Sequence, residues 1–239
     1  MENATYVGLS MQMALETGFD VIANNIANVN TTAYQAQEVM FTEYLANAAG
    51  SGEISYIYDV AVMRDVTPGP SVATGNPLDV AIVGEGYFMI ETANGIRYTR
   101  NGSFRLDGDG QLVSAGGGAV LGEGDQPFFL TADETAITIS RDGTVSTENG
   151  AIGRLRLVTF ENEQEMIKVG DSLFTTEEPP LEATEAEVIQ GMIEQSNVQA
   201  VLELTRMIEV SRAYQRAQQI IEAGDQLELS VIRTLTESV

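Results

Sequence analysis

The side chains left for chemistry in this chain are carboxylates, hydroxyls, tyrosines and a few basic groups. Its 239 residues include 35 Asp and Glu but no His and no Cys. Imidazole bases, thiolate nucleophiles and the usual transition-metal ligands are therefore excluded, and most hydrolase triads with them. Paired carboxylates could still hydrolyse a glycoside, although among so many acidic residues some pairs lie close by chance. We expect no enzymatic activity and no cofactor.

Two short motifs resemble ligand-binding loops but lack their defining residues. Asp107-Gly-Asp109-Gly-Gln111 begins like a calcium loop, but Gly118 stands where an EF-hand loop ends on a bidentate Glu. Gly84-Glu-Gly86 begins like a dinucleotide fingerprint, but Met89 stands where the last glycine belongs. We predict β-turns at both places and no metal site.

The chain is strongly acidic, with a formal net charge of −23 and a pI near 4.1. Because such a surface repels phosphate backbones and anionic lipid, we expect no nucleic-acid partner and no membrane-surface binding. The apolar runs are too short to cross a bilayer, so no membrane insertion is expected. No Lys or Arg precedes Arg64, whereas a secretory signal begins with a positive segment. Any export is therefore expected to use another route.

Elements that could position functional residues are clearest at the two ends of the chain. Near the N-terminus, apolar residues recur every three or four positions and share one helix face: Met11, Leu15, Phe19, Ile22, Ile26 and Val29. Asn24, Asn25 and Asn28 lie off this face. Asparagine is a weak helix former, so this cluster indicates amides with packed partners, which could belong to a neighbouring chain. Alternatively, residues 28–32 only end the helix and open a turn.

The C-terminal region predicts a long helix with two apolar faces. Ser196 and Gln199 have the spacing of a capping box, and the periodic sequence runs to near Leu235. The first face contains Val198, Val201, Thr205 and Ile208, and the second contains Val210, Ala213, Ala217, Ile220, Gly224, Leu227 and Val231. Two faces require more than one neighbour, and steps of three and four are typical of coiled coils. The N-terminal helix is the expected partner within the chain, and a helical hairpin that closes a single monomer is the alternative.

Between the two ends the sequence predicts a mostly antiparallel β domain. Short β-forming runs alternate with turn residues such as Asn94-Gly95, and their apolar residues predict a core that contains Phe88, Phe104, Phe128, Leu155 and Phe160. The predicted class is α+β. The domains are an N-terminal helix at 1–34, an extended connector with strand pieces and a possible short helix around Met40 to Tyr44 at 35–74, the β domain at 75–180, and a linker with the C-terminal helix at 181–239.

Four segments in this order resemble signatures of the bacterial flagellar rod and hook proteins. They are residues 20–34 (DVIANNIANVNTTAY), 74–88 (TGNPLDVAIVGEGYF), 98–112 (YTRNGSFRLDGDGQL), and Glu194-Gln-Ser-Asn-Val198 followed by Met207-Ile208 and Arg212-Ala-Tyr214. They span nearly the whole chain. One departure is Ala33, where the family usually has Gly. If that Gly takes a positive φ, the turn must be altered here.

The resemblance implies a structural subunit of the periplasmic rod of the flagellar basal body. Such a subunit is exported by the flagellar type III apparatus without a cleaved signal peptide, and it packs by its terminal helices, with copies of itself and other rod proteins, into a tube that transmits torque. The chain length, Glu2 and Tyr6 favour a proximal rod subunit. A distal rod or hook subunit is the alternative within the family, and an extracellular adhesin or binding module is the alternative outside it. The predicted assembly contacts are Met11, Leu15, Ile22, Asn24, Asn25, Ile26, Asn28, Asn197, Val198, Val201, Ile208, Val210, Ala213, Ala217, Ile220, Gly224, Leu227 and Val231.

Overall fold

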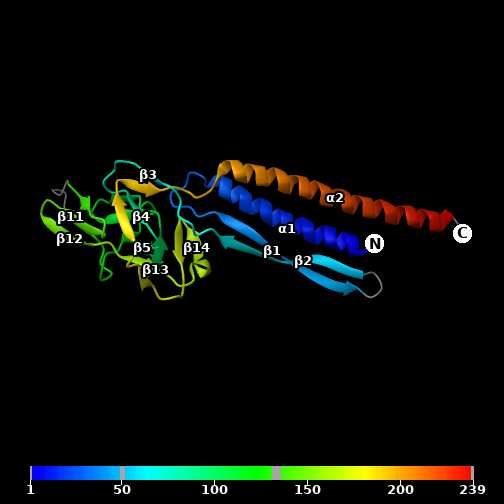
Figure 1. Ribbon diagram of the computed structural model, residues 1–239, viewed down its shortest axis with the longest axis horizontal. Helices are drawn as coiled ribbons and strands as arrows, with labels where there is room; N and C mark the ends of the chain where they lie inside the picture. Colours follow the sequence, from blue (N-terminus) through cyan, green and yellow to red (C-terminus); the bar gives the residue numbers. More distant parts are fainter. Residues whose placement is uncertain (1, 49–51, 131–135, 238–239) are drawn as a thin grey trace. The chain divides into compact units, whose positions relative to one another are not determined.

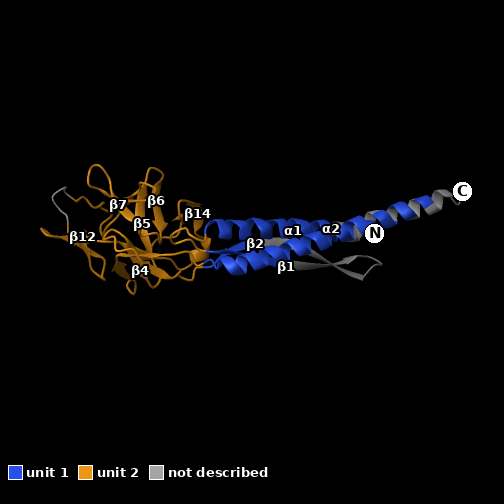
Figure 2. Cartoon of the chain, turned by 90° about the horizontal axis from the view of Figure 1, so that it is seen from above, with its two compact units in different colours: residues 1–28, 36–65, 198–239 blue, residues 29–35, 66–197 orange. Residues whose placement is uncertain are grey.

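The computed structural model describes residues 2–48, 52–130 and 136–237, which form two compact units (Figures 1 and 2). Unit 1 combines residues 1–28, 36–65 and 198–239, and unit 2 combines residues 29–35 and 66–197. Both ends of the chain thus contribute to one helical unit, while most of the residues between them form a mostly antiparallel β unit. The predicted α+β class is confirmed.

Unit 1 contains two helices and a long β-hairpin. Helix α1 (Glu2–Ala27) lies beside helix α2 (Ala200–Glu237), and the two run in opposite directions (Figure 1). Strands β1 (Gln37–Ala48) and β2 (Gly52–Arg64) pair antiparallel, with a bulge between Thr42 and Glu43, and pack against α1. The N-terminal helix lies within the segment 1–34 predicted for it but ends at Ala27, and residues 29–35 belong to unit 2. Neither helix, over the residues described, has a stretch long and apolar enough to span a membrane.

The short helix expected around Met40 to Tyr44 is wrong, because these residues lie in β1. Met40 pairs with Ala61 and Phe41 with Val60 on the opposite strand. A short apolar run fits either periodicity, and the partner strand decides between them. Most of segment 35–74, expected as a connector, is therefore a hairpin that belongs to the helical unit.

Helix α2 begins later than the capping box predicted. Its first residue is Ala200, and the first helical hydrogen bond runs from the Glu203 N–H to the Gln199 carbonyl at 3.1 Å. Unit 2 holds the preceding segment in an extended form, because the Asn197 N–H donates to the Tyr34 carbonyl and its side-chain amide to the Thr67 carbonyl. Ser196 is therefore outside the helix and cannot cap it.

Unit 2 is built from short antiparallel strands, as predicted. The first of these strands are β4 (Val80–Val83), β5 (Tyr87–Thr92), β6 (Gly95–Thr99), β7 (Phe104–Leu106), β8 (Leu112–Ser114) and β9 (Ala119–Val120). In the largest sheet the order is β14-β15-β6-β5-β9-β8-β7, with β14 at Ile167–Gly170 and β15 at Leu173–Thr175. Strand β13 (Leu157–Thr159) pairs with β5 and with β16 (Leu181–Glu182), and the 3-10 turn η1 (Glu163–Glu165) precedes β14.

The remaining strands extend the β unit in both directions along the chain. Strands β10 (Thr138–Ile139), β11 (Thr144–Thr147) and β12 (Gly150–Arg154) form a small sheet. Strand β17 (Glu187–Gln190) pairs with β4, and β18 (Met192–Glu194) pairs with β3 (Ser71–Ala73). The β unit therefore continues past Pro180, where an exit from it was expected. The pairing of β17 with β4 accounts for this, since it fully buries Val188.

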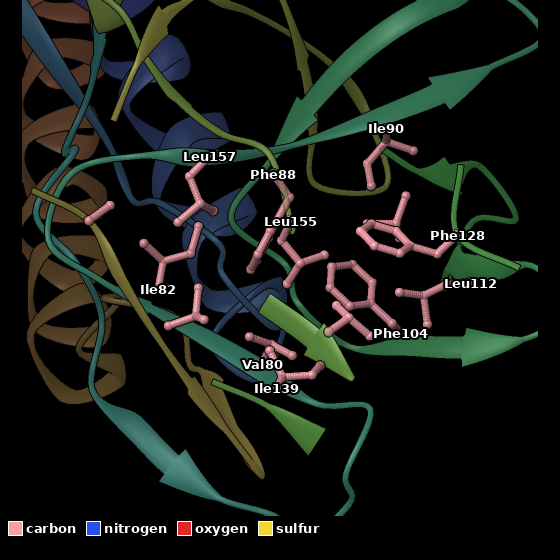
Figure 3. Packing of buried hydrophobic residues seen from close by; sticks show 14 of the residues in the cluster. Val80, Ile82, Phe88, Ile90, Phe104, Leu112, Phe128, Ile139, Leu155 and Leu157 are labelled. Atoms are coloured by element: carbon pink, nitrogen blue, oxygen red, sulfur yellow. The ribbon is translucent and has the colours of Figure 1, made fainter. Parts of the chain in front are cut away.

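Strand β5 separates two apolar clusters in unit 2. Phe88 and Ile90 point into the first cluster with Phe104, Phe128 and Leu155 (Figure 3). The alternate residues Tyr87 and Met89 enter the second cluster, which includes Phe160. The predicted core aromatic residues and Leu155 are thus confirmed as buried. Because both faces of β5 are covered, this strand is apolar at successive positions rather than alternating.

Ala33 adopts the left-handed backbone conformation that a glycine would favour. Its φ is 53°, it is fully buried, and its N–H donates to the Glu194 carbonyl at 2.9 Å. A left-handed conformation costs an alanine about 1–2 kcal/mol, so the surrounding contacts must impose it. The positive φ at this position is therefore reached without a glycine.

Candidate functional site

The α1–α2 pair is closed by small residues that let the helices approach. A Cβ at Gly8 would stand 2.7 Å from Cγ1 of Ile221, and one at Gly18 would stand 4.0 Å from Cγ1 of Val210. Ala217 on α2 is 1% exposed. Small residues at a helix seam shorten the distance between the helices and increase the contact between them. The paired ends of the chain therefore form a closely packed seam inside unit 1.

Asn25 connects three elements of unit 1. Its side-chain amide donates to the Gln37 carbonyl at 2.8 Å and to the Glu203 carboxylate at 3.2 Å, and its carbonyl oxygen accepts from the Gln37 N–H at 2.9 Å. Asn25 is only 1% exposed. A buried amide with these three bonds fixes the positions of α1, β1 and α2 relative to one another. The packed partners expected for the asparagine cluster are thus found, for Asn25, within the same chain.

Glu203 is a buried carboxylate in the first turn of α2. It is 4% exposed and receives the Asn25 amide on one oxygen and the Arg206 guanidinium on the other at 2.8 Å. Arg206 also reaches the Glu38 carboxylate on β1 at 3.3 Å. A buried charge needs such partners. The missed signal was its spacing, since Glu203 stands seven residues before Val210, which itself stands seven before Ala217.

The other two asparagines of the N-terminal cluster lie near the surface. Asn24 is exposed, and Asn28 is half-buried just after the last residue of α1. The Asn28 amide donates to the carbonyl and the side-chain oxygen of Asn24, at 2.8 and 3.0 Å. Asn197 lies in unit 2, where its hydrogen bonds hold the segment that precedes α2.

The predicted apolar contacts divide into covered and uncovered sets. The covered set, buried or half-buried in unit 1, contains Met11, Leu15, Ile22, Ile26, Val198, Val210, Ala213, Ala217 and Gly224. The uncovered set contains Val201, Ile208, Ile220 and Leu227, each more than half exposed. The side chain of Val231 lies outside the described residues. The helix pair satisfies one face of α2 and leaves another without a neighbour within the described chain.

Further exposed apolar residues lie on the same elements of unit 1. On α1 these are Leu9 and Met13, and on α2 they are Leu202, Leu204 and Leu229. Met40, Phe41, Val62 and Met63 are exposed on the hairpin. A groove of about 280 Å³ runs beside them between α1, β1 and α2, lined by Ile22, Phe41 and Val210. Unit 2 also exposes apolar side chains, such as Phe129 and Ile167, whereas those of unit 1 follow its two helices and its hairpin.

Unit 2 has the features of a rigid scaffold. The buried pair Arg100 and Glu194 is joined at 2.8 Å, and Arg100 also donates to the Gly84 and Gly86 carbonyls. The Gly69 N–H donates to the other oxygen of Glu194 at 3.1 Å. The motif that began like a dinucleotide fingerprint is therefore a bend between β4 and β5 whose carbonyls bind an arginine. This network ties four segments of unit 2 together.

Acidic residues of unit 2 occur in a turn and along an exposed cleft. The Gly110 N–H donates to the Asp107 carbonyl at 3.2 Å and closes the predicted β-turn, while the Asp107 carboxylate accepts from the N–H groups of Asp109 and Gln111 at 2.9 and 2.8 Å. No group of three Asp or Glu residues among those described is arranged to hold a metal ion. A cleft of about 430 Å³ is lined by Glu85, Glu182 and Glu185. All three are exposed, whereas a glycosidase acid sits in apolar surroundings that keep it protonated.

Comparison with known proteins gives three family matches in chain order. Residues 6–35 match the model described as "Flagella basal body rod protein", residues 81–147 the "Flagellar hook protein FlgE/F/G D1 domain", and residues 189–234 the "Flagellar basal body rod FlgEFG protein C-terminal". The first model covers most of α1, and the third covers α2 from its start.

Relatives match the chain over nearly its whole length. The flagellar basal-body rod protein FlgF of Caulobacter vibrioides is 38% identical over 98% of both chains, and FlgF of Mesorhizobium japonicum is 33% identical over 98% of both. The rod protein FlgG of Agrobacterium fabrum is 34% identical over 93% of this chain and 95% of its own. The resemblance that the sequence motifs indicated is confirmed, with FlgF proteins among the relatives. The chain belongs to the flagellar basal-body rod protein family.

Proposed function

We propose that this chain is a structural subunit of the flagellar basal-body rod. It packs by its terminal helices, with copies of itself and with other rod proteins, into a tubular shaft that transmits torque for motility. The observation that carries the proposal is the uncovered set of apolar residues on the helices of unit 1. A stable helix pair that still exposes Val201, Ile208, Ile220 and Leu227 gains from burying them against a neighbour.

The arrangement of polar contacts suits a subunit under torsional load. Asn25 and Glu203 fix the helix pair and the hairpin from inside unit 1, and Arg100 with Glu194 does the same within unit 2. Buried hydrogen-bonded networks resist relative movement of the elements that they join. Such a role requires no cofactor and no catalytic residue, and we propose that the chain is not an enzyme.

The proposal includes a place in the proximal rod, in the periplasm, reached through the flagellar type III export apparatus without removal of a signal peptide. Family membership and the FlgF relatives support a basal-body location. An extracellular adhesin, the alternative from another class, has no support among the comparisons.

The test is electron microscopy of purified basal bodies from cells that carry an epitope-tagged chain. Labelled antibody at the proximal end of the rod, with normal motility, is the expected result. Mass spectrometry of the same preparation reads the N-terminus of the assembled subunit and so tests for cleavage. A tagged, functional chain that is absent from basal bodies would refute the proposal.

A further inference from the structure

The exposed side of α1 presents two apolar residues followed by two acidic ones. These residues share a helix face because they are three or four positions apart, and we call them the acidic face: Leu9, Met13, Glu16 and Asp20. All four are exposed. No ion pair within the described part of unit 1 uses either carboxylate.

The exposed side of α2 presents the complementary order. Two arginines are followed by two apolar residues, and we call this set the basic face: Arg212, Arg216, Ile220 and Leu227. These side chains are also exposed, and neither arginine has an ion-pair partner among the described residues. In a chain with a net charge of −23, two adjacent exposed arginines without a partner stand out.

Each face carries an unfavourable pair of like charges. Glu16 and Asp20 are four residues apart, as are Arg212 and Arg216, and like charges at this spacing destabilise a helix. The two pairs have opposite signs and the same span, about 6 Å at about 1.5 Å per residue. One pair placed against the other would remove both repulsions and form two ion pairs.

We propose that the acidic face of one copy of this chain packs against the basic face of a second copy. The two helices run antiparallel, with Glu16 opposite Arg216 and Asp20 opposite Arg212. In the same alignment Met13 lies opposite Ile220, and Leu9 lies opposite the turn between Ala223 and Leu227. Charged residues thus meet opposite charges, and exposed apolar residues meet one another.

The antiparallel direction of the two contacting helices follows from the proposed function, and the inference rests on that function. Copies added to a helical tube all have the same orientation and meet through two different surfaces. Because α1 and α2 are antiparallel within one chain, α1 of one copy and α2 of its neighbour are antiparallel as well. A copy turned end over end would instead place the helices parallel and bring Met13 opposite Ile208.

The absence of cysteine from the sequence allows a clean cross-linking test. Two versions of the full chain, of different size, are produced in the same motile cells, one with Met13→Cys and the other with Ile220→Cys. Oxidation is expected to give a covalent heterodimer in basal bodies. The matched control pairs Met13→Cys with Ile208→Cys, whose exposed fraction of 54% is close to the 56% of Ile220. A control product that equals or exceeds that of the Ile220 pair would overturn the proposed alignment.

Charge reversal tests the ion pairs directly. The double variants Glu16→Arg with Asp20→Arg, and Arg212→Glu with Arg216→Glu, are each expected to lose motility and incorporation. The four substitutions combined in one chain are expected to restore both, since every interface then carries the reversed pairs. A combined variant no better than either double variant would overturn the inference. Wild-type chain recovered in basal bodies with no Met13–Ile220 cross-link would refute this inference alone, whereas absence of the wild-type chain there would refute the proposed function.

Discussion

Removal of the Asn25 side chain tests whether this amide holds unit 1 together. In Asn25→Ala, three hydrogen bonds are lost: two with the backbone of Gln37 and one with the carboxylate of Glu203. Each is worth about 0.5–1.5 kcal/mol net, and Glu203 stays buried with one donor fewer. We expect the free energy of unfolding of unit 1 to fall by about 2–4 kcal/mol.

Urea unfolding followed by far-ultraviolet circular dichroism measures this loss, because α1 and α2 both belong to unit 1 and dominate the helical signal. Asn24→Ala is the matched control. Its side chain is one residue away and exposed, and the bond that it accepts from the Asn28 amide lies at the surface, so we expect a change within about 0.5 kcal/mol. The double variant Asn25→Ala with Glu203→Ala completes a cycle that isolates the coupling between the two side chains. A loss below about 0.5 kcal/mol for Asn25→Ala would refute the argument that this amide fixes the unit.

Three further predictions follow from burial on each unit. Ala217→Asp places an unpaired carboxylate at a buried seam position, which is costly, so we expect this variant to lose the helix pair. Ile220→Asp changes an exposed position and should keep the monomer helical but abolish motility. Equal helicity of the two variants would contradict this prediction. Arg100→Met leaves the Glu194 carboxylate buried without its guanidinium partner, and we expect the free energy of unfolding of unit 2 to fall by about 3–5 kcal/mol. Urea unfolding followed by tyrosine fluorescence measures this change. An unchanged unfolding midpoint would count against the network. Gly102→Ala places a Cβ 1.8 Å from the Val80 carbonyl oxygen and should unfold unit 2 in the same assay, and wild-type stability of that variant would rule out the close contact.

Local patterns in the sequence were sufficient for the elements of this fold that depend on nearby residues. Apolar spacing of three and four predicted both terminal helices, and turn residues such as Asn94-Gly95 and the Asp107 turn predicted hairpins of unit 2. The β1–β2 hairpin was not predicted. The apolar pattern around Met40 fits a helix as well as a strand, and the pairing with β2 decides between them. Helix α2 begins later than the capping box predicted for a related reason. Asn197 forms hydrogen bonds with distant backbone groups, and these keep the segment with the predicted cap outside the helix.

The sequence by itself determined which residues share a helix face, because the helical repeat fixes that from spacing alone. It could not determine which face is covered within the chain, since this depends on where another helix lies. Only the tertiary structure separated Ala217, buried in the seam, from Ile220, exposed three residues later. It likewise placed Glu203 inside and gave Asn25 its partners, because the burial of a polar group is decided by long-range hydrogen bonds and not by its neighbours in sequence.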